Sequence, residues 1–127
     1  MGWYVGKGEK MKIRNLTPHT VTIISENGDC LAQFPSEGIA RARQTNVSAG
    51  SVLPDGMENP IPLVMTTFGE PEGLPDPKHG VMLIVSIITA NAAKANGRDI
   101  NDLLLTCDPV RDEEGRIIGC RSLALYR

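Results

Sequence analysis

The sequence predicts an α+β fold, a mostly antiparallel β-sheet with one principal helix at about residues 87–96 packed on it. Short segments in which polar and apolar residues alternate recur along the chain, as expected of half-buried strands. Thirteen glycines and nine prolines in 127 residues indicate frequent turns between short elements. An alanine-rich segment between Ser86 and Gly97 carries a cap residue at each end, which predicts the helix.

The N-terminal half contains most of the predicted strands. We expect residues 1–10 to form a flexible leader and residues 11–127 to form a single α+β domain. In the first 48 residues, alternating segments and an Asn27-Gly28 turn predict an antiparallel meander. Its strands are expected at 12–16, 21–25, 30–34 and 39–43. The Pro- and Gly-rich segment 49–62 predicts a loop, and 61–68 predicts a strand.

The C-terminal half alternates buried segments with turns. The continuous apolar run 81–85 predicts a central strand covered on both faces. Segment 103–107 predicts a second buried strand, and Gly115 predicts the turn of a C-terminal hairpin. The connection 69–80 contains three prolines and is long for a small domain. The side chains expected to pack the helix on the sheet are Ile84, Ile87, Ile88, Ala92 and Ala95.

Composition excludes several classes of function. The net charge is −2 and no lysine-arginine run is present, which argues against a binder of duplex nucleic acid. Three cysteines without a C-x-x-C pair and only two histidines give no zinc signature and predict a reduced, cytoplasmic location. The apolar run 81–85 is too short to span a bilayer, so no membrane association is expected.

The sequence contains no complete catalytic set. Cys107 precedes Asp108-Pro109 at the end of a predicted strand, and only His19 or His79 offers it a base. No spacing brings either histidine to Cys107, so a buried structural cysteine is the favoured interpretation. A G-x-S-x-G elbow, a P-loop and a dinucleotide fingerprint are all missing. We therefore predict no catalytic residue, no metal ligand and no cofactor.

Several residues nevertheless suit an anionic ligand. The N-terminus of the predicted helix offers unpaired N–H groups beside Ser86, and arginine forks match phosphate or carboxylate. Pro18 explains a turn at 15–19, but a turn needs no imidazole, which makes His19 a candidate. The plainer alternatives are that Ser86 only caps the helix and that His19 is an exposed loop residue. The ligand-binding candidates are Arg14, His19, Thr66, Thr67, Ser86, Arg111 and Arg121.

A resemblance to a known family is carried by five segments: RNLTPHTVTI, PSEGIARA, TTFGEPEGLPDP, VMLIVSIITANAA and DPVRDEEGRIIGCRSLALY. Together they resemble a family of short proteins carried by phages and prophages and found in bacterial genomes. The resemblance covers nearly all of residues 11–126 and implies a viral protein acting in the cytoplasm of a bacterial host. No catalytic residue is established in that family, so the resemblance assigns no role to any residue.

The leading hypothesis from these observations is a non-enzymatic binding protein, expected to be a homo-oligomer, that captures a small anionic, nucleotide-like ligand. By analogy with small phage proteins that sequester nucleotide second messengers, it would be a sponge for host defence signals, although source does not fix function. One alternative is a small hydrolase of phosphodiester or nucleotide substrates that uses His19 with a carboxylate. Another is a phage structural or host-protein-binding component that uses the acidic loop 69–80.

Overall fold

The structure of the protein is a computed structural model that describes residues 10–127. The predicted flexible leader lies outside the described residues except for Lys10. The described part contains eight strands and one short helix, so the α+β class predicted from the sequence is confirmed. In chain order the elements are β1 (Lys12–Asn15), β2 (Val21–Ile24), β3 (Cys30–Phe34), β4 (Gln44–Val52), β5 (Ile61–Phe68), β6 (Val81–Ile84), α1 (Ile87–Ala95), β7 (Leu103–Arg111) and β8 (Ile117–Leu125).

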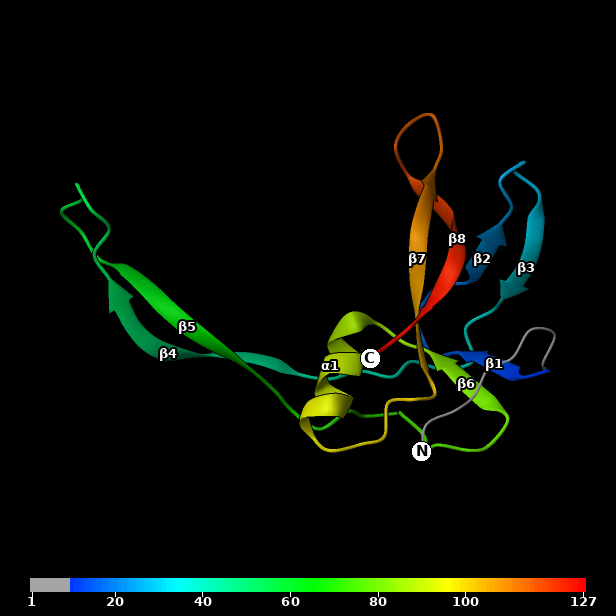
Figure 1. Cartoon of the computed structure of the whole chain (residues 1–127), viewed down its shortest axis with the longest axis horizontal. Coiled ribbons are helices and arrows are strands. Elements are labelled where there is room, and N and C mark those ends of the chain that lie inside the picture. Colours follow the sequence, from blue (N-terminus) through cyan, green and yellow to red (C-terminus); the bar gives the residue numbers. More distant parts are fainter. Residues whose placement is uncertain (1–9) are drawn as a thin grey trace.

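The strands form one curled sheet and one separate ribbon. The sheet has six strands in the order β1-β6-β7-β8-β2-β3, and β4 pairs only with β5 in a ribbon that projects from the rest of the molecule (Figure 1). Three pairs are parallel, β1–β6, β6–β7 and β2–β8. The longest pairings, β7–β8 and β4–β5, are antiparallel. Strand pairing among the described residues is therefore mixed, with antiparallel pairing over the longest strands.

The predicted N-terminal meander is wrong in its connections. The β2–β3 hairpin is confirmed, and Gly28 in its turn has φ 90°. However, β1 pairs with β6 instead of β2, and segment 39–43 forms only a bridge between Arg41 and Glu72. Residues 49–52, predicted as loop, continue β4. The pairing of β1 with β6 was not predicted because parallel partners are distant in sequence. Residues 49–52 were not predicted as strand because these small residues have no hydrophobic pattern, and backbone pairing holds them in β4.

The two edge strands of the curled sheet meet at Asn15, whose side chain is fully buried. Its Nδ2 donates hydrogen bonds to the carbonyl oxygens of His19 and Phe34, both at 2.7 Å. Its Oδ1 accepts from the backbone N and the Oγ1 of Thr17, at 2.9 and 2.7 Å. The backbone of Asn15 also forms a parallel bridge with Ser36, just after β3. We call this set of contacts the Asn15 junction, because it brings the last strand of the sheet back to the first.

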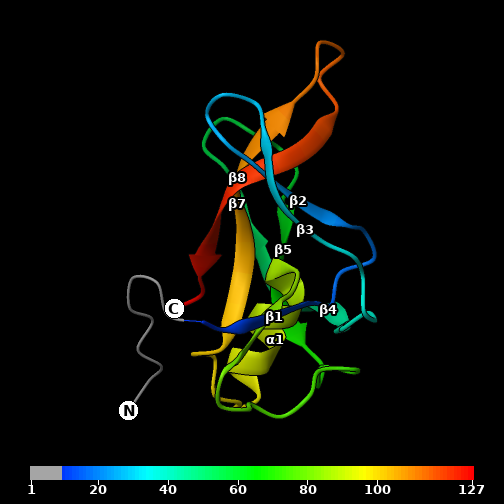
Figure 2. The same cartoon turned by 90° about the vertical axis from the view of Figure 1, so that its right-hand side faces the viewer.

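The core lies on both faces of the central strand β6. Leu83 belongs to a buried cluster shared with α1, which also contains Leu103 and Tyr126. Met82 and Ile84 belong to a second cluster on the opposite face, together with residues of β2, β7 and β8. The prediction of a central strand covered on both faces is thus confirmed. Figure 2 shows β7 and β8 running upward from the level of α1, with β2 and β3 in front of them.

The helix α1 begins and ends as predicted but packs through a different face. The Oγ of Ser86 accepts from Thr89 N at 3.2 Å, and Gly97 follows the helix with φ 80°. The buried helix residues are Thr89, Ala90, Ala92 and Ala93. Ile87 and Ile88, predicted to face the sheet, are 51% and 41% exposed, and Ala95 is also exposed. The small alanine side chains allow close packing on the sheet, and the isoleucines lie outside that contact.

A buried ion pair fixes the long connection 69–80. The guanidinium of Arg98 makes two hydrogen bonds to the carboxylate of Asp102, at 2.8 and 2.9 Å, and Asp102 is only 1% exposed. The same guanidinium donates to the carbonyl of Pro75 at 2.7 Å. A buried carboxylate is stable only when it is paired and hydrogen-bonded, and this planar fork satisfies that requirement. The connection is therefore attached at its middle to the turn that precedes β7.

Asn15→Ala is expected to lower the free energy of unfolding by about 3 kcal/mol, because the Phe34 carbonyl and the Thr17 N–H lose their bonds to Asn15 and the His19 carbonyl keeps only the Thr17 hydroxyl. Asn15→Asp is expected to be at least as damaging at neutral pH. It would set a carboxylate oxygen against the carbonyls of His19 and Phe34. Urea unfolding followed by circular dichroism measures both changes.

The matched control is Asn59→Ala, which removes an exposed amide at the end of the ribbon. This variant is expected to stay within about 0.5 kcal/mol of the unaltered protein. An Asn15→Ala protein as stable as the Asn59→Ala protein would contradict the importance given to the Asn15 junction.

Candidate functional site

A groove of about 560 Å³ lies between the start of β2 and the strands β7 and β8. Residues 19–22 form one wall, Thr106, Cys107 and Pro109 form a second, and residues 117–120 form the third. We call it the His19 groove. Its volume lies within the range of about 300–1,000 Å³ that is usual for small-molecule sites.

The lining of the His19 groove is mainly apolar, with a few polar groups. Val21 and Cys120 are buried at its base, and the exposed Ile117 and Ile118 add apolar surface. The polar groups are the imidazole of His19, the Cys107 thiol and the hydroxyls of Thr20, Thr22 and Thr106. No Asp, Glu, Lys or Arg is among the lining residues. The groove thus offers apolar surface together with hydroxyl, thiol and imidazole groups that can form hydrogen bonds.

The backbone is unusual where it forms the walls of this groove. Asp108 has φ 57°, a left-handed conformation that Asp adopts more readily than most residues. The β7–β8 pairing omits Asp108, and the next residue, Pro109, has no N–H to donate. On the facing strand, a Cβ added at Gly119 would lie 2.8 Å from the carbonyl oxygen of Thr22. A glycine is therefore required for β8 to approach β2 this closely.

A second, separate hollow of about 430 Å³ lies at the start of the helix. It shares Val21 and Thr106 with the His19 groove and extends to Thr17, Ser86 and Ile87 at the start of α1. Within the first turn, Thr89 N and Ala90 N bond to Ser86. Helix geometry leaves the first N–H groups without intrahelical partners, and the helix dipole makes this end positive. The two hollows are therefore neighbours, one lined by His19 and the other lying at a helix N-terminus.

Of the seven predicted ligand-binding residues, the structure places His19 in the groove and Ser86 in the second hollow. Arg14 lies elsewhere, 3.5 Å from the carboxylate of Glu37, in a separate hollow of about 270 Å³ that Lys12 and Lys78 also line. These two lysines were not singled out by the sequence, because β1 and the 69–80 connection come together only in the fold.

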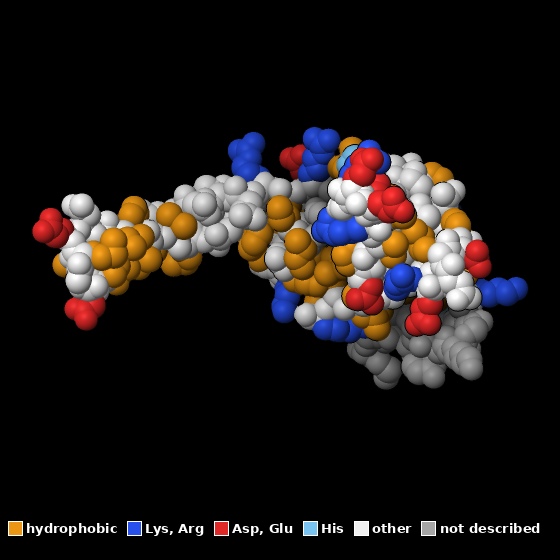
Figure 3. Space-filling view, turned by 90° about the horizontal axis from the view of Figure 1, so that it is seen from above, with side chains coloured by type: hydrophobic (Ala, Val, Ile, Leu, Met, Phe, Trp, Pro, Cys, Tyr) orange, Lys and Arg blue, Asp and Glu red, His pale blue; other side chains and the backbone are white. Residues whose placement is uncertain are grey.

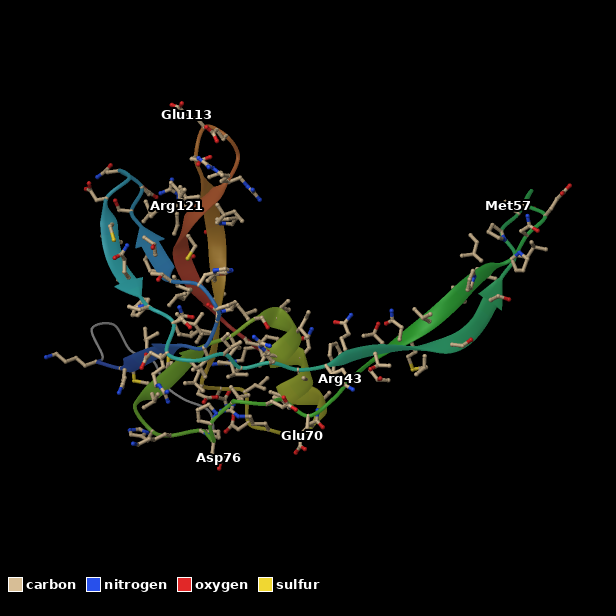
Figure 4. All side chains as sticks on the ribbon, turned by 180° about the vertical axis from the view of Figure 1, so that it is seen from behind. Arg43, Met57, Glu70, Asp76, Glu113 and Arg121 are labelled. Atoms are coloured by element: carbon tan, nitrogen blue, oxygen red, sulfur yellow. The ribbon has the colours of Figure 1, made fainter. Side chains whose placement is uncertain are left out.

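None of the other four predicted residues lines either hollow. Thr66 and Thr67 lie on the projecting ribbon, where their hydroxyls bond to Asn46 and to the Thr45 carbonyl. Arg111 donates to the carbonyl of Gly115 at 2.7 Å. Arg121 donates to the carbonyl of Ser25 at 2.6 Å and so joins β8 to the β2–β3 hairpin. Figure 4 shows Arg121 on the body and Met57 at the far end of the ribbon.

Sequence reasoning also missed groups that the fold adds to the two hollows. Thr17 and Thr106 come from segments that are far apart in sequence and meet only when β2 lies beside β7 and β8. Arg41 lies near Ser86 and Thr17, in a hollow on the outer side of the helix N-terminus. The one sequence signal for the groove itself was Asp108-Pro109, because a proline within a strand indicates a local break in strand pairing.

Residues 10–127 contain no group of three His, Cys, Asp or Glu side chains placed to hold a metal ion. Among these same residues, no helix has the length and apolar character needed to cross a membrane. Comparisons with protein-family models, with curated proteins and with solved structures found no match to this chain.

The turn of the β7–β8 hairpin is organised by Asp112. Its Oδ1 accepts from the backbone N–H of Arg116 and of Glu114, both at 2.9 Å, and its Oδ2 accepts from Arg116 Nε at 3.0 Å. The backbone hydrogen bond from Arg116 is the main cause that holds the pKa of Asp112 below its ordinary value of 3.8. Because the folded pKa is lowered, the carboxylate stabilises the turn above its ordinary pKa, and this contribution is lost as pH falls through the folded pKa.

A ¹³C NMR titration is expected to show the Asp112 carboxyl with a midpoint below 3.8. The amides of Glu114 and Arg116 should lose protection from hydrogen exchange as the carboxyl is protonated. Arg116→Ala keeps the backbone N–H, so the midpoint should remain below the ordinary value. A midpoint at or above 3.8 in the unaltered protein would contradict this account of the turn.

Proposed function

We propose that the protein is a non-enzymatic binding protein that holds a small, nucleotide-like ligand across the two neighbouring hollows lined by His19 and by Ser86. The observation that carries this proposal is that the two hollows share Val21 and Thr106. One of them is an apolar groove and the other lies at a helix N-terminus. A ligand with an apolar ring and an anionic group matches this arrangement.

The apolar part of the ligand would lie in the His19 groove. Ile118 and the buried Val21 offer surface to a flat ring, and the hydroxyl of Thr106 offers hydrogen bonds to its edge. Sites for small molecules generally combine such apolar walls with a few placed polar groups. The exposed imidazole of His19 can donate to a ring carbonyl or to a phosphate.

The anionic part of the ligand would lie at the start of α1. Helix N-termini favour phosphate and carboxylate groups, since the first N–H groups point outward and the dipole is positive there. Thr17 and Ser86 add hydroxyls, and Arg41 supplies a cation on the outer side of the same helix end. Of the seven residues predicted from the sequence, only His19 and Ser86 belong to the proposed site.

The composition of the two hollows favours binding over hydrolysis. A hydrolase that uses His19 with a carboxylate needs an acidic side chain within hydrogen-bond reach of the imidazole or of the attacked group. Neither of the two hollows has an Asp or Glu among its lining residues. The proposal is therefore capture of the ligand without turnover, as expected for a phage-borne sponge of host signals.

Isothermal titration with cyclic oligonucleotides, ADP-ribose derivatives and inorganic phosphate tests the proposal. At least one nucleotide is expected to bind, and His19→Ala should weaken it by about tenfold or more, the loss of one good hydrogen bond. Thr106→Val keeps the shape of the side chain but removes the hydroxyl, and a smaller loss is expected. No binding at tens of micromolar across the panel would reject the proposal.

Thr67→Val on the projecting ribbon is the matched control, because it removes a predicted ligand-binding hydroxyl that lies away from both hollows. Its affinity should equal that of the unaltered protein. Chromatography after overnight incubation should return the bound nucleotide intact. Product that accumulates with the unaltered protein and not with His19→Ala would instead support the hydrolase.

A further inference from the structure

The projecting ribbon is the part of the chain that the proposed ligand site leaves unexplained. It comprises β4, β5 and the turn between them, residues 44–68, and we call it the arm. Every residue of β4 is exposed, and so is every residue of β5 except Phe68 at its end. Near its base, Gly69 N bonds to the Arg43 carbonyl, and Asn96 at the end of α1 bonds to Gly69. A two-stranded ribbon of this kind is at best marginally stable alone in water.

The arm has one apolar face and one largely polar face. Directly opposed residues in an antiparallel pair share a face, and the register sets Val47 opposite Met65 and Val52 opposite Ile61. Leu63 lies between Ile61 and Met65 on the same side of β5. These five side chains form what we call the apolar arm face, and they are 43–59% exposed. The other face carries Asn46, Ser48, Ser51 and Thr66, with Pro62 and Val64 as its apolar residues.

A bulge in β4 is what keeps the apolar arm face continuous. Val47 and Val52 are five residues apart and would point to opposite faces of a regular strand. The pairing shifts by one residue between Ser48 and Ser51, and Gly50 within the shift has φ 95°. The extra residue turns Val52 back to the face of Val47. The bulge therefore leaves the ribbon with one continuous apolar face, which is the pattern of a strand pair that covers an apolar surface.

The charge of the arm limits what can cover it. From Gln44 to Phe68 there is no Lys or Arg, and the two acidic residues, Asp55 and Glu58, lie in the turn. A surface without cations does not suit the phosphates of nucleic acid or an anionic lipid surface. Figure 3 shows hydrophobic side chains gathered along the arm and on the body where the arm joins it. The partner is therefore an uncharged, apolar protein surface.

A second copy of this chain supplies such a surface. Ile39, Ile87 and Ile88 on the body are 39%, 51% and 41% exposed. A compact monomer of this mass would expose about 6,600 Å², whereas this chain, of 13.7 kDa, exposes 8814 Å². The chain therefore exposes more surface than a compact monomer of its mass, and the exposed strands of the arm contribute to that excess. Two arms can be covered at once in a symmetric pair, because a twofold axis uses the same surface on each copy.

We propose that the apolar arm face packs against a second copy of the chain, so that two copies exchange arms. The interface is centred on Leu63, with Val47 and Met65 beside it. Its formation requires no ligand at His19 or Ser86.

Sedimentation equilibrium and size-exclusion chromatography with light scattering test this on the full chain without ligand. The unaltered protein is expected at twice 13.7 kDa or a higher multiple. Leu63→Glu should weaken association by about 30-fold or more, because it places a charge in an apolar contact. Val64→Glu is the matched control. It changes the next residue, of similar size and exposure, on the opposite face, and should leave the mass unchanged.

Met65→Lys and Thr66→Lys form a second pair with charge of the other sign, and only Met65→Lys should dissociate the assembly. Circular dichroism verifies that each variant is folded. A 13.7 kDa monomer at about 100 micromolar, a concentration well above the Kd of a stable dimer, would overturn the proposal. Equal effects of Leu63→Glu and Val64→Glu, whether both dissociate or neither does, would overturn it as well.

Discussion

The fold depends on the burial of one amide, that of Asn15. A buried amide must satisfy both its donors and its acceptor, and Asn15 does so within a short stretch of chain and across the sheet. Its Nδ2 donates to the carbonyl oxygens of His19 and Phe34, and its Oδ1 accepts from Thr17. Since Phe34 ends β3 and Asn15 ends β1, the two edges of the sheet cannot separate without exposing or orphaning these groups. The large cost of an unpaired buried amide makes this closure specific as well as stable.

The same junction positions the candidate site. Because Asn15 holds the carbonyl of His19, the loop after β1 turns tightly and β2 begins directly beside the junction. Gly119 then lets β8 come against Thr22, and the left-handed Asp108 interrupts β7 opposite that contact. The groove between these strands thus arises from three backbone features of the sheet. The imidazole and the hydroxyls line the space that these features leave, and the helix N-terminus lies beside it.

The sequence predicts local structure well and long-range structure poorly, for physical reasons. The Asn27-Gly28 turn, the Ser86 cap and the two-sided burial of β6 each have a local cause, and each is confirmed. The parallel pairing of β1 with β6 has no local signal, because its partners are distant in sequence. In α1, size mattered more than hydrophobicity, so alanines rather than isoleucines face the sheet. For the candidate site, His19 could be singled out as an unexplained imidazole, whereas Thr17 and Thr106 could be found only once their segments had met.

The central claim is that Asn15 joins the two edges of the sheet, and NMR of its side-chain amide tests this most directly. Through-hydrogen-bond couplings are expected from Asn15 Nδ2 to the carbonyl carbons of His19 and Phe34, and both amide protons should exchange slowly with solvent. The exposed amide of Asn59 should show neither property. An Asn15 amide that exchanges as fast as that of Asn59 and has no coupling to Phe34 would contradict the account.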